Sequence, residues 1–432
     1  MGGTQQQRSQ ERTTPMRPPR GYRRHSRIRG ISITAVLATG ALVLTACGSS
    51  LPGGNDSADS GASDRAVKIG LLVPTSGVYA SLGKDMTQGF QLYLDEHENK
   101  LGGFDVDLVK ADEGEGPDTG VPAATRLVQQ NSVSAIVGVV NSAVALGLKD
   151  LVTEAKVPLL IANAGANDLT GPGASPYIWR TSYANAQPDY ALGKYVADQL
   201  AGSGGVYLLG ADYAAGKEHL AGFKAAFEAA GGEVLGEQYT PFGTTKDFQP
   251  YLSTAQASGA KAVFAFYAGA EAVSFVKQYT AFGLSDSMQL YSAGFLTEGG
   301  VLEAQGADAL GVMTSLQYSD TLDNAVNKDF VAAYTKAFSG VPTGYAVGAY
   351  DAAAVLDKVL KTVGSTDGTK IADGIKEVGD IDSPRGTWNF DEGHNPIQSF
   401  YLRKVEQSGD GFANVIVEEL GRFDQATATG RG

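Results

Sequence analysis

The chain has 432 residues, with 47 acidic and 34 basic side chains, a formal net charge of −13 at pH 7 and one cysteine. This acidic balance argues against a nucleic-acid partner or an anionic membrane surface, and one cysteine provides neither an internal disulfide nor a thiolate metal site. The length exceeds that of a typical single domain, so we expect two, each stabilised by a hydrophobic core.

Residues 1–46 have the layout of a bacterial lipoprotein signal peptide. Eight arginines and a single acid precede an uncharged apolar segment, residues 31–46, which ends in Leu44-Thr45-Ala46 directly before Cys47. The segment is shorter than the about 20 apolar residues that span a membrane comfortably. We therefore predict cleavage before Cys47 and its acylation, with the mature protein held at the extracytoplasmic face of the cell membrane by its lipid alone. An uncleaved signal anchor is the alternative.

The mature chain opens with a tether and a first set of alternating strands and helices. Residues 47–65 are rich in Gly, Ser and Asp and predict a flexible segment. Predicted strands alternate here with predicted helices of about 12 to 17 residues, and this alternation indicates right-handed β-α-β units around a parallel sheet. The predicted strands are residues 67–73, 104–109, 135–140 and 158–162, and the predicted helices are residues 83–99, 119–130 and 143–154.

A second set of elements follows residue 182, and it predicts a second α/β lobe. The helical patterns near the C-terminus indicate that the chain returns to the first lobe, and residues 425–432 look disordered. Predicted helices cover residues 188–201, 217–230, 330–338 and 345–363, and predicted strands cover residues 206–210, 262–266, 289–291 and 399–405.

Signatures of catalysis are missing from the chain. The segment from Gly210 to Lys217 is one residue too long for a phosphate-binding loop, and Glu218 replaces the hydroxyl that would hold magnesium. There is no G-x-S-x-G elbow, and the mature histidines are far apart in sequence, without metal-ligand spacing. We therefore predict no enzyme activity, no cofactor and no metal.

Candidate binding loops follow the predicted strands at their carboxyl ends, where open α/β sheets bind ligands. Asn141 and Ser142 follow residues 135–140, and Ser142 either caps the next helix or offers its hydroxyl and N–H to an anion. The loop Asn163-Ala164-Gly165 follows residues 158–162. Its small residues let a ligand approach backbone amides, although an ordinary tight turn has the same composition.

Aromatic residues take similar positions in the second lobe. Tyr213, Tyr267 and Phe295 each lie at the end of a predicted strand. A single aromatic residue is more commonly part of a core than of a ligand wall, but three at equivalent positions favour a ligand wall.

These residues also carry a family resemblance. The chain resembles the leucine/isoleucine/valine-binding-protein type of ABC-transporter solute receptor over residues 66–424. The resemblance rests on the segment Gly70-Leu-Leu-Val-Pro-Thr-Ser-Gly77, the turn Gly138-x-x-Asn141-Ser142, residues 158–165 and Arg180-Thr181-Ser182.

The resemblance implies a type 1 periplasmic binding protein fold: two Rossmann-like α/β lobes with parallel sheets, joined by three crossover strands, with the ligand in the cleft between them. It implies lobe 1 at residues 66–182 and 317–389 and lobe 2 at residues 183–316 and 390–424. It also implies a monomer that closes near Ser182 and Gln317 around a small molecule and presents it to an ABC permease. A sensor that does not transport would use the same fold.

Amino-acid binders of this type hold the ligand carboxylate on residues matching Ser142 and the loop Asn163 to Gly165, and they place an acid against the ammonium group. Here Phe295 stands at the acid's position, so an ammonium would need Glu298, three residues on. We therefore expect a small carboxylate, with an aromatic acid favoured over a branched-chain amino acid or an amide. The chain resembles the aromatic-carboxylate branch at residues 163–165, 175–177, 212–217, 275–279 and 394–398. The expected site is Tyr79, Asn141, Ser142, Asn163, Ala164, Gly165, Tyr213, Tyr267 and Phe295.

Overall fold

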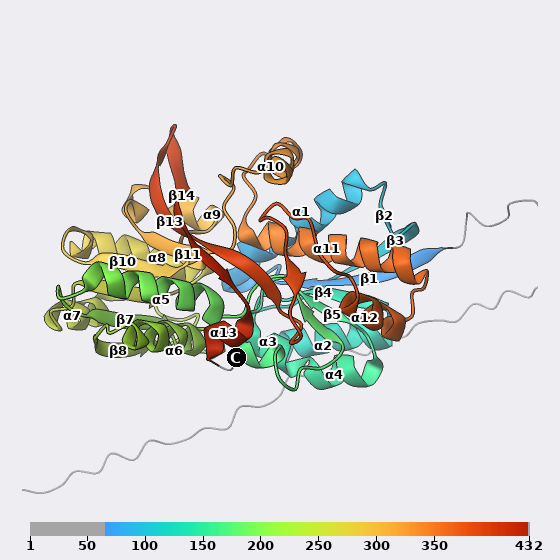
Figure 1. Ribbon diagram of the computed structural model, residues 1–432, viewed down its shortest axis with the longest axis horizontal. Helices are drawn as coiled ribbons and strands as arrows, with labels where there is room; N and C mark the ends of the chain where they lie inside the picture. Colours follow the sequence, from blue (N-terminus) through green and yellow to red (C-terminus); the bar gives the residue numbers. More distant parts are fainter. Residues whose placement is uncertain (1–64, 431–432) are drawn as a thin grey trace, which may run out of the picture. The chain divides into compact units, whose positions relative to one another are not determined.

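A computed structural model describes residues 65–430, so the predicted signal peptide and Cys47 lie outside the described residues. The first lobe is built on a sheet with strand order β2-β3-β1-β4-β5-β6, in which every neighbouring pair is parallel except β2 and β3 (Figure 1). Its central strands are apolar and buried because helices cover both faces of the sheet. The strands are β1 (Ala66–Val73), β2 (Lys100–Leu101), β3 (Phe104–Asp112), β4 (Ala135–Gly138), β5 (Leu159–Ile161) and β6 (Ile178–Arg180).

The helices of the first lobe come from both ends of the chain. Helix α1 packs along α11, and their backbones approach so closely at Gly89 that a side chain there would overlap the carbonyl oxygen of Ala346. The predicted return of the chain to the first lobe is therefore seen directly. The elements are η1 (Gly77–Tyr79), α1 (Ala80–Glu96), α2 (Pro117–Gln129), α3 (Ser142–Gly147), α4 (Lys149–Ala155), η2 (Asn167–Leu169), α10 (Ala325–Phe338), α11 (Gly344–Val363) and α12 (Gly368–Lys376).

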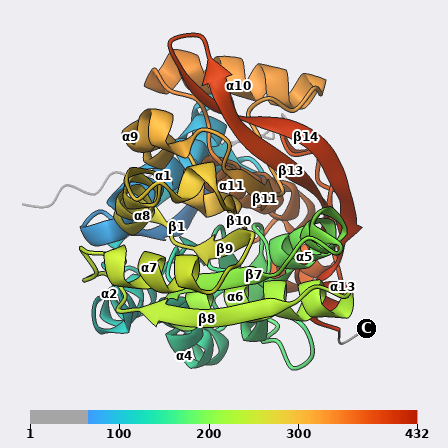
Figure 2. The ribbon, with the colours of Figure 1, turned by 90° about the vertical axis from the view of Figure 1, so that its left-hand side faces the viewer.

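The second lobe has a sheet with strand order β12-β13-β11-β10-β9-β7-β8, and β14 pairs with β13. Strands β8, β7, β9, β10 and β11 are parallel, whereas β13 is antiparallel to β11, β12 and β14. Figure 2 shows β8 at one edge of this sheet and the hairpin of β13 and β14, in red, at the other. The strands are β7 (Val206–Ala211), β8 (Val234–Thr240), β9 (Ala262–Phe266), β10 (Gln289–Ala293), β11 (Met313–Leu316), β12 (Asn389–Phe390), β13 (Pro396–Ser408) and β14 (Gly411–Phe423).

The helices of the second lobe include one, α13, in a segment that was expected to be disordered. Residues 425–432 were expected to be disordered, but residues 425–429 form α13, with Asp424 as N-cap. The side chain of Gln425 is buried, accepts a hydrogen bond from Thr170 Oγ1 at 2.6 Å and donates to Asn167 O at 2.6 Å. The elements are α5 (Ala186–Leu200), α6 (Ala214–Ala229), α7 (Gln249–Ala257), α8 (Gly269–Ala281), η3 (Leu284–Asp286), η4 (Gly294–Thr297), α9 (Gly300–Gln305), η5 (Gly306–Ala309) and α13 (Gln425–Thr429).

Three connections join the lobes: residues 181–185 lead from β6 to α5, residues 317–324 from β11 to α10, and residues 377–388 from α12 to β12. A buried polar cluster ties two of them together. Arg385 Nη1 donates to Ser182 O at 3.0 Å and to Gln398 Oε1 at 2.7 Å, and Gln398 Nε2 donates to the same Ser182 carbonyl at 2.7 Å. The predicted fold class, two α/β lobes with three crossovers, is confirmed.

Candidate functional site

A small cavity of about 20 Å³ lies between the lobes, beyond the carboxyl ends of several strands. This is the position at which open α/β sheets bind ligands. The cavity, which we call the interlobe pocket, has polar groups mainly from the first lobe and aromatic groups from both lobes. Its lining residues are Tyr79, Leu82, Val140, Ser142, Asn163, Gly165, Tyr183, Asn185, Tyr213, Ala215, Phe266, Ala268, Phe295 and Tyr345.

A larger hollow of about 690 Å³ lies beside residues 171–174, residues 390–394 and helix α13. It includes none of the expected site residues, and its acids, among them Asp391 and Glu392, would repel an anion. The interlobe pocket is the candidate site because it combines the expected residues from both lobes.

The structure brings together six of the expected site residues and leaves three outside the pocket lining. Those outside are Asn141, Ala164 and Tyr267. Those that line the pocket are Tyr79, Ser142, Asn163, Gly165, Tyr213 and Phe295.

Asn141, rather than Ser142, caps helix α3. Its Oδ1 accepts the N–H of Ala143 at 2.8 Å and of Val144 at 3.4 Å, and its Nδ2 donates to Glu115 O at 2.9 Å. Of the two roles that the sequence allows for Ser142, the capping role therefore belongs to its neighbour. The Ser142 hydroxyl lines the pocket without a hydrogen-bond partner in the part of the chain that the structure describes.

Glu113 holds the start of this loop by hydrogen bonds to its backbone. The sequence did not predict this role. The Glu113 carboxylate oxygens accept the N–H groups of Val140 and Asn141, both at 2.7 Å. Burial raises the pKa of Glu113 to about 8, although the two N–H donors favour its ionised form. A lone glutamate after a strand gives no local signal of this role, since its partners are distant in sequence.

The loop after β5 offers fewer free amides than the sequence suggested. The Ala164 N–H donates to Val139 O at 2.9 Å, so it is already engaged. Asn163 Nδ2 donates to Val140 O at 3.3 Å. Gly165 is required because a Cβ at this position would overlap the side-chain oxygen of Asn185.

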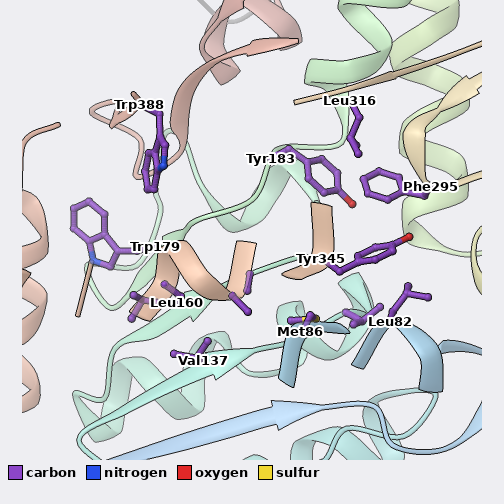
Figure 3. Close-up of a cluster of buried hydrophobic side chains, with 14 of the residues drawn as sticks. Leu82, Met86, Val137, Leu160, Trp179, Tyr183, Phe295, Leu316, Tyr345 and Trp388 are labelled. Atoms are coloured by element: carbon purple, nitrogen blue, oxygen red, sulfur yellow. The ribbon is translucent and has the colours of Figure 1, made fainter. Parts of the chain in front are cut away.

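Six of the fourteen residues that line the pocket are aromatic. Figure 3 shows Tyr183, Phe295 and Tyr345 gathered together, with Phe295 stacked on Tyr183 at 4.7 Å between ring centroids and tilted against Tyr345 at 5.8 Å. Phe266 meets Phe295 edge-on at 6.3 Å. Tyr183, Phe266 and Tyr345 were not predicted from the sequence as pocket residues. The residues around Tyr345 do not indicate a role at the pocket. Tyr345 belongs to α11, which follows the point where the chain crosses back from the second lobe to the first.

Tyr267 points away from the pocket because its neighbour Phe266 points into it. Successive side chains of a strand face opposite sides of the sheet. Tyr267 therefore packs against Phe275, at 4.5 Å between ring centroids, in the core of the second lobe, and its hydroxyl lies 3.3 Å from Thr240 Oγ1.

A hydrogen bond joins the two lobes at the pocket. The Tyr79 hydroxyl, from the first lobe, donates to the Tyr213 hydroxyl, from the second, at 2.9 Å. Burial raises the pKa of both phenols, so both hydroxyls stay protonated at neutral pH.

Glu298 does not line the pocket. Its Oε2 lies 2.8 Å from Arg403 Nη1, and its Oε1 accepts the N–H of Gly344 at 2.7 Å. Both oxygens of this buried carboxylate are therefore occupied. Among the described residues that line the pocket, none carries a charged side chain.

His219 lies behind the pocket and stacks on Phe266 at 3.7 Å between ring centroids. Its Nδ1 is 2.7 Å from Asp189 Oδ2, and burial raises the pKa of Asp189 to about 6. Within residues 65–430, no group of three or more His, Cys, Asp or Glu residues is arranged to hold a metal ion. Across the same residues, no helix is both long enough and apolar enough to cross a membrane.

The fold and the pocket together define a two-lobed receptor for a small molecule. Residues 66–410 match the family model described as a periplasmic binding protein, and the chain belongs to this family. A Leu/Ile/Val-binding protein homolog of Brucella melitensis is 34% identical over 353 residues, which cover 80% of this chain and 89% of the relative.

Two solved structures extend the comparison. A solute-binding protein of an ABC transporter from R. palustris, in complex with benzoate, is 34% identical with a TM-score of 0.75, over 83% of this chain and 97% of that one. Another, from Rhodopseudomonas palustris BisB5 in complex with 3,4-dihydroxybenzoic acid, is 33% identical with a TM-score of 0.78, over 85% and 99%. The resemblance found in the sequence is confirmed. The family is an extracytoplasmic class of solute-binding receptors rather than a class of enzymes.

Proposed function

We propose that the protein is a lipid-anchored receptor that captures a small aromatic carboxylate and delivers it to an ABC importer by closing its two lobes. The R. palustris relatives support the ligand class, since they were solved with benzoate and with 3,4-dihydroxybenzoic acid. The predicted acylation of Cys47 supports the anchor.

The observation that carries the proposed ligand class is an aromatic pocket without a charged lining residue in the described part of the chain. A bound amino acid would bury an ammonium group, and burying a charge without a partner costs several kcal/mol. A cation–π contact with Phe295 would recover about 2 kcal/mol, which is only part of that cost. An aromatic acid has no ammonium group, and its ring matches the pocket wall.

The carboxylate would bind at the loops of the first lobe. The Ser142 hydroxyl and the Gly165 N–H lie on the first-lobe loops that line the pocket, and neither has a partner among the described residues. Each charge-assisted hydrogen bond to a carboxylate contributes about 1.5–3 kcal/mol. The rings of Tyr183, Phe266 and Phe295 would enclose the aromatic part of the ligand.

Entry of a ligand requires the lobes to part. The cavity of about 20 Å³ has room for little more than a water molecule, whereas ligand pockets are commonly about 300–1,000 Å³. The Tyr79–Tyr213 hydrogen bond must therefore break for a ring to enter. We place the hinge at the connections near Ser182 and Gln317, with lobe 1 at residues 66–182 and 317–389 and lobe 2 at residues 183–316 and 390–424.

Calorimetry on the full mature chain tests the proposed function. Benzoate and hydroxybenzoates are compared with leucine, isoleucine and valine, and Ser142→Ala is compared with Ser315→Ala. Ser315 is a matched control because its buried hydroxyl also lacks a partner among the described residues, but it lies in β11 outside the pocket lining. We expect at least one aromatic acid to bind more tightly than the amino acids, and Ser142→Ala alone to weaken it.

A branched-chain amino-acid receptor is the second candidate, supported by the name of the Brucella melitensis relative. The same titrations decide between the two. Tighter binding of leucine than of every aromatic acid would overturn the proposed ligand class.

A further inference from the structure

Asn185 lines the interlobe pocket and is almost completely buried, with 1% of its surface exposed. It immediately precedes helix α5, at the crossover from the first lobe to the second. Its backbone N–H donates to Gly165 O at 2.7 Å, so the residue is held firmly against the loop that is expected to bind the carboxylate.

The orientation of the Asn185 amide is set by Glu218. Asn185 Nδ2 donates to Glu218 Oε2 at 2.9 Å, and the same oxygen accepts the N–H of Asn167 at 2.8 Å. A carboxylate oxygen accepts hydrogen bonds, so the amide nitrogen must face it and the amide oxygen must face the other way.

That oxygen has no partner. Asn185 Oδ1 is buried without a hydrogen bond to any residue from 65 to 430. An asparagine at this position commonly caps its helix, but the Asn185 side chain makes no such bond. The first N–H of the helix, from Ala186, instead donates to Asn167 Oδ1 at 3.2 Å. The Asn185 oxygen is therefore left as a buried acceptor beside Gly165, another residue of the pocket lining, which costs free energy until a donor reaches it.

A second pocket residue has an unpaired polar atom. The hydroxyl of Tyr345 is buried without a partner in the described chain, and Tyr345 is 1% exposed. A hydroxyl donates or accepts, so it suits a carboxylate as well as another hydroxyl. The amide oxygen of Asn185 only accepts, so a carboxylate cannot satisfy it and a ligand hydroxyl can.

We propose that Asn185 is a specificity-determining residue that selects ligands with a hydroxyl group in addition to the carboxylate, that is, hydroxylated aromatic acids over unsubstituted ones. This inference rests on the proposed function, since it takes an aromatic carboxylate as the ligand. A site built to bind a hydroxyl rejects the analogue that lacks it, because the buried polar group is then left unpaired.

The test measures the ratio of dissociation constants for benzoate and for each monohydroxybenzoate by calorimetry on the full mature chain. Asn185→Leu removes the acceptor at similar volume. Asn167→Ala is the matched control, since it removes a hydrogen bond at the start of the same helix from a residue outside the pocket lining.

We expect the unmodified protein to bind one hydroxybenzoate at least about tenfold more tightly than benzoate. We expect Asn185→Leu to reduce this ratio to within about twofold, mainly through loss of hydroxybenzoate affinity, and Asn167→Ala to preserve it. A role of Asn185 in folding alone would weaken both ligands equally and leave the ratio unchanged, which would overturn the inference.

The unmodified protein provides a test that does not depend on the variant folding. Equal affinity for benzoate and all the hydroxybenzoates would overturn the role of Asn185 and leave the proposed function intact. Binding of amino acids with no binding of any aromatic acid would overturn the proposed function itself.

Discussion

The hydroxyl of Tyr79 and the hydroxyl of Tyr213 form a hydrogen bond of 2.9 Å that joins the two lobes at the pocket. The lobes cannot separate while this bond is intact. It therefore stabilises a closed state whose cavity of about 20 Å³ has no room for a ring, and this state competes with ligand binding.

We expect Tyr213→Phe to strengthen ligand binding by about 1 kcal/mol, or roughly fivefold, because it removes a hydrogen bond that stabilises a closed state whose cavity is too small for the ligand. Calorimetry measures the affinity, and small-angle scattering with and without ligand measures closure. Tyr267→Phe is the control, since it removes a buried tyrosine hydroxyl outside the pocket lining. Equal effects of the two changes would contradict a role for the interlobe bond.

Glu298 gives a prediction about stability. We expect Glu298→Gln to lower the free energy of unfolding by about 3 kcal/mol, because Arg403 would lose the charge of its partner in a buried ion pair. The ratio of leucine affinity to aromatic-acid affinity should stay the same. Urea denaturation measures the free energy of unfolding, and calorimetry measures the ratio of affinities. The control is Glu303→Gln, a change at an exposed glutamate five residues on. A selective loss of leucine binding would show that Glu298 meets an ammonium group after all.

Glu113 gives a prediction about pH. Burial raises its pKa in the folded protein to about 8, from an ordinary value of 4.5. Folding therefore favours the protonated acid, so the stability from this group is complete below about pH 4.5 and is lost as the pH rises through 8.

We expect the free energy of unfolding of the unmodified protein to fall relative to that of Glu113→Gln by on the order of 3 kcal/mol between pH 5 and pH 9. Urea denaturation across this range measures the difference, and the exposed acid Glu154, changed to Gln, is the control. A constant difference between the unmodified protein and Glu113→Gln would mean that Glu113 does not titrate in this range.

The lipid anchor is tested in cells. We expect the protein to take up a fatty-acid probe at Cys47 and the Cys47→Ala variant to be lost from the membrane fraction, because the preceding apolar segment is too short to span a bilayer comfortably. An unlabelled protein that is still processed at another position would rule out acylation at Cys47.

The sequence predicted the central strands β1, β4 and β5 of the first sheet and β7, β9 and β10 of the second, because buried parallel strands are continuous apolar runs, but it missed the central strand β11. It missed β8 and β14, where polar residues and glycines interrupt the apolar pattern. It also missed α13, since the contacts of Gln425 are with residues about 250 positions earlier in the chain.

At the site, the predicted strand ends indicated the loops that line the pocket. Which of two neighbouring residues faces the pocket could not be predicted, because this depends on local backbone geometry. Tyr267 was expected in the pocket and Phe266 lies there, because one residue along a strand reverses the face. The position of Tyr345 could not be predicted from the sequence, because it depends on how α11 packs on the first lobe.

The uncharged pocket has a consequence for the kinetics of ligand capture. The predicted mature chain, from Cys47 onward, has 46 acidic and 26 basic residues and a net charge of −20, so an approaching anion is repelled at long range and no lining cation among the described residues attracts it at the end. Added salt screens that repulsion over about 10 Å at 0.1 M. The association rate of the ligand should therefore increase with ionic strength, whereas its dissociation rate, set by hydrogen bonds from uncharged donors and by ring contacts in a closed cleft, should hardly change.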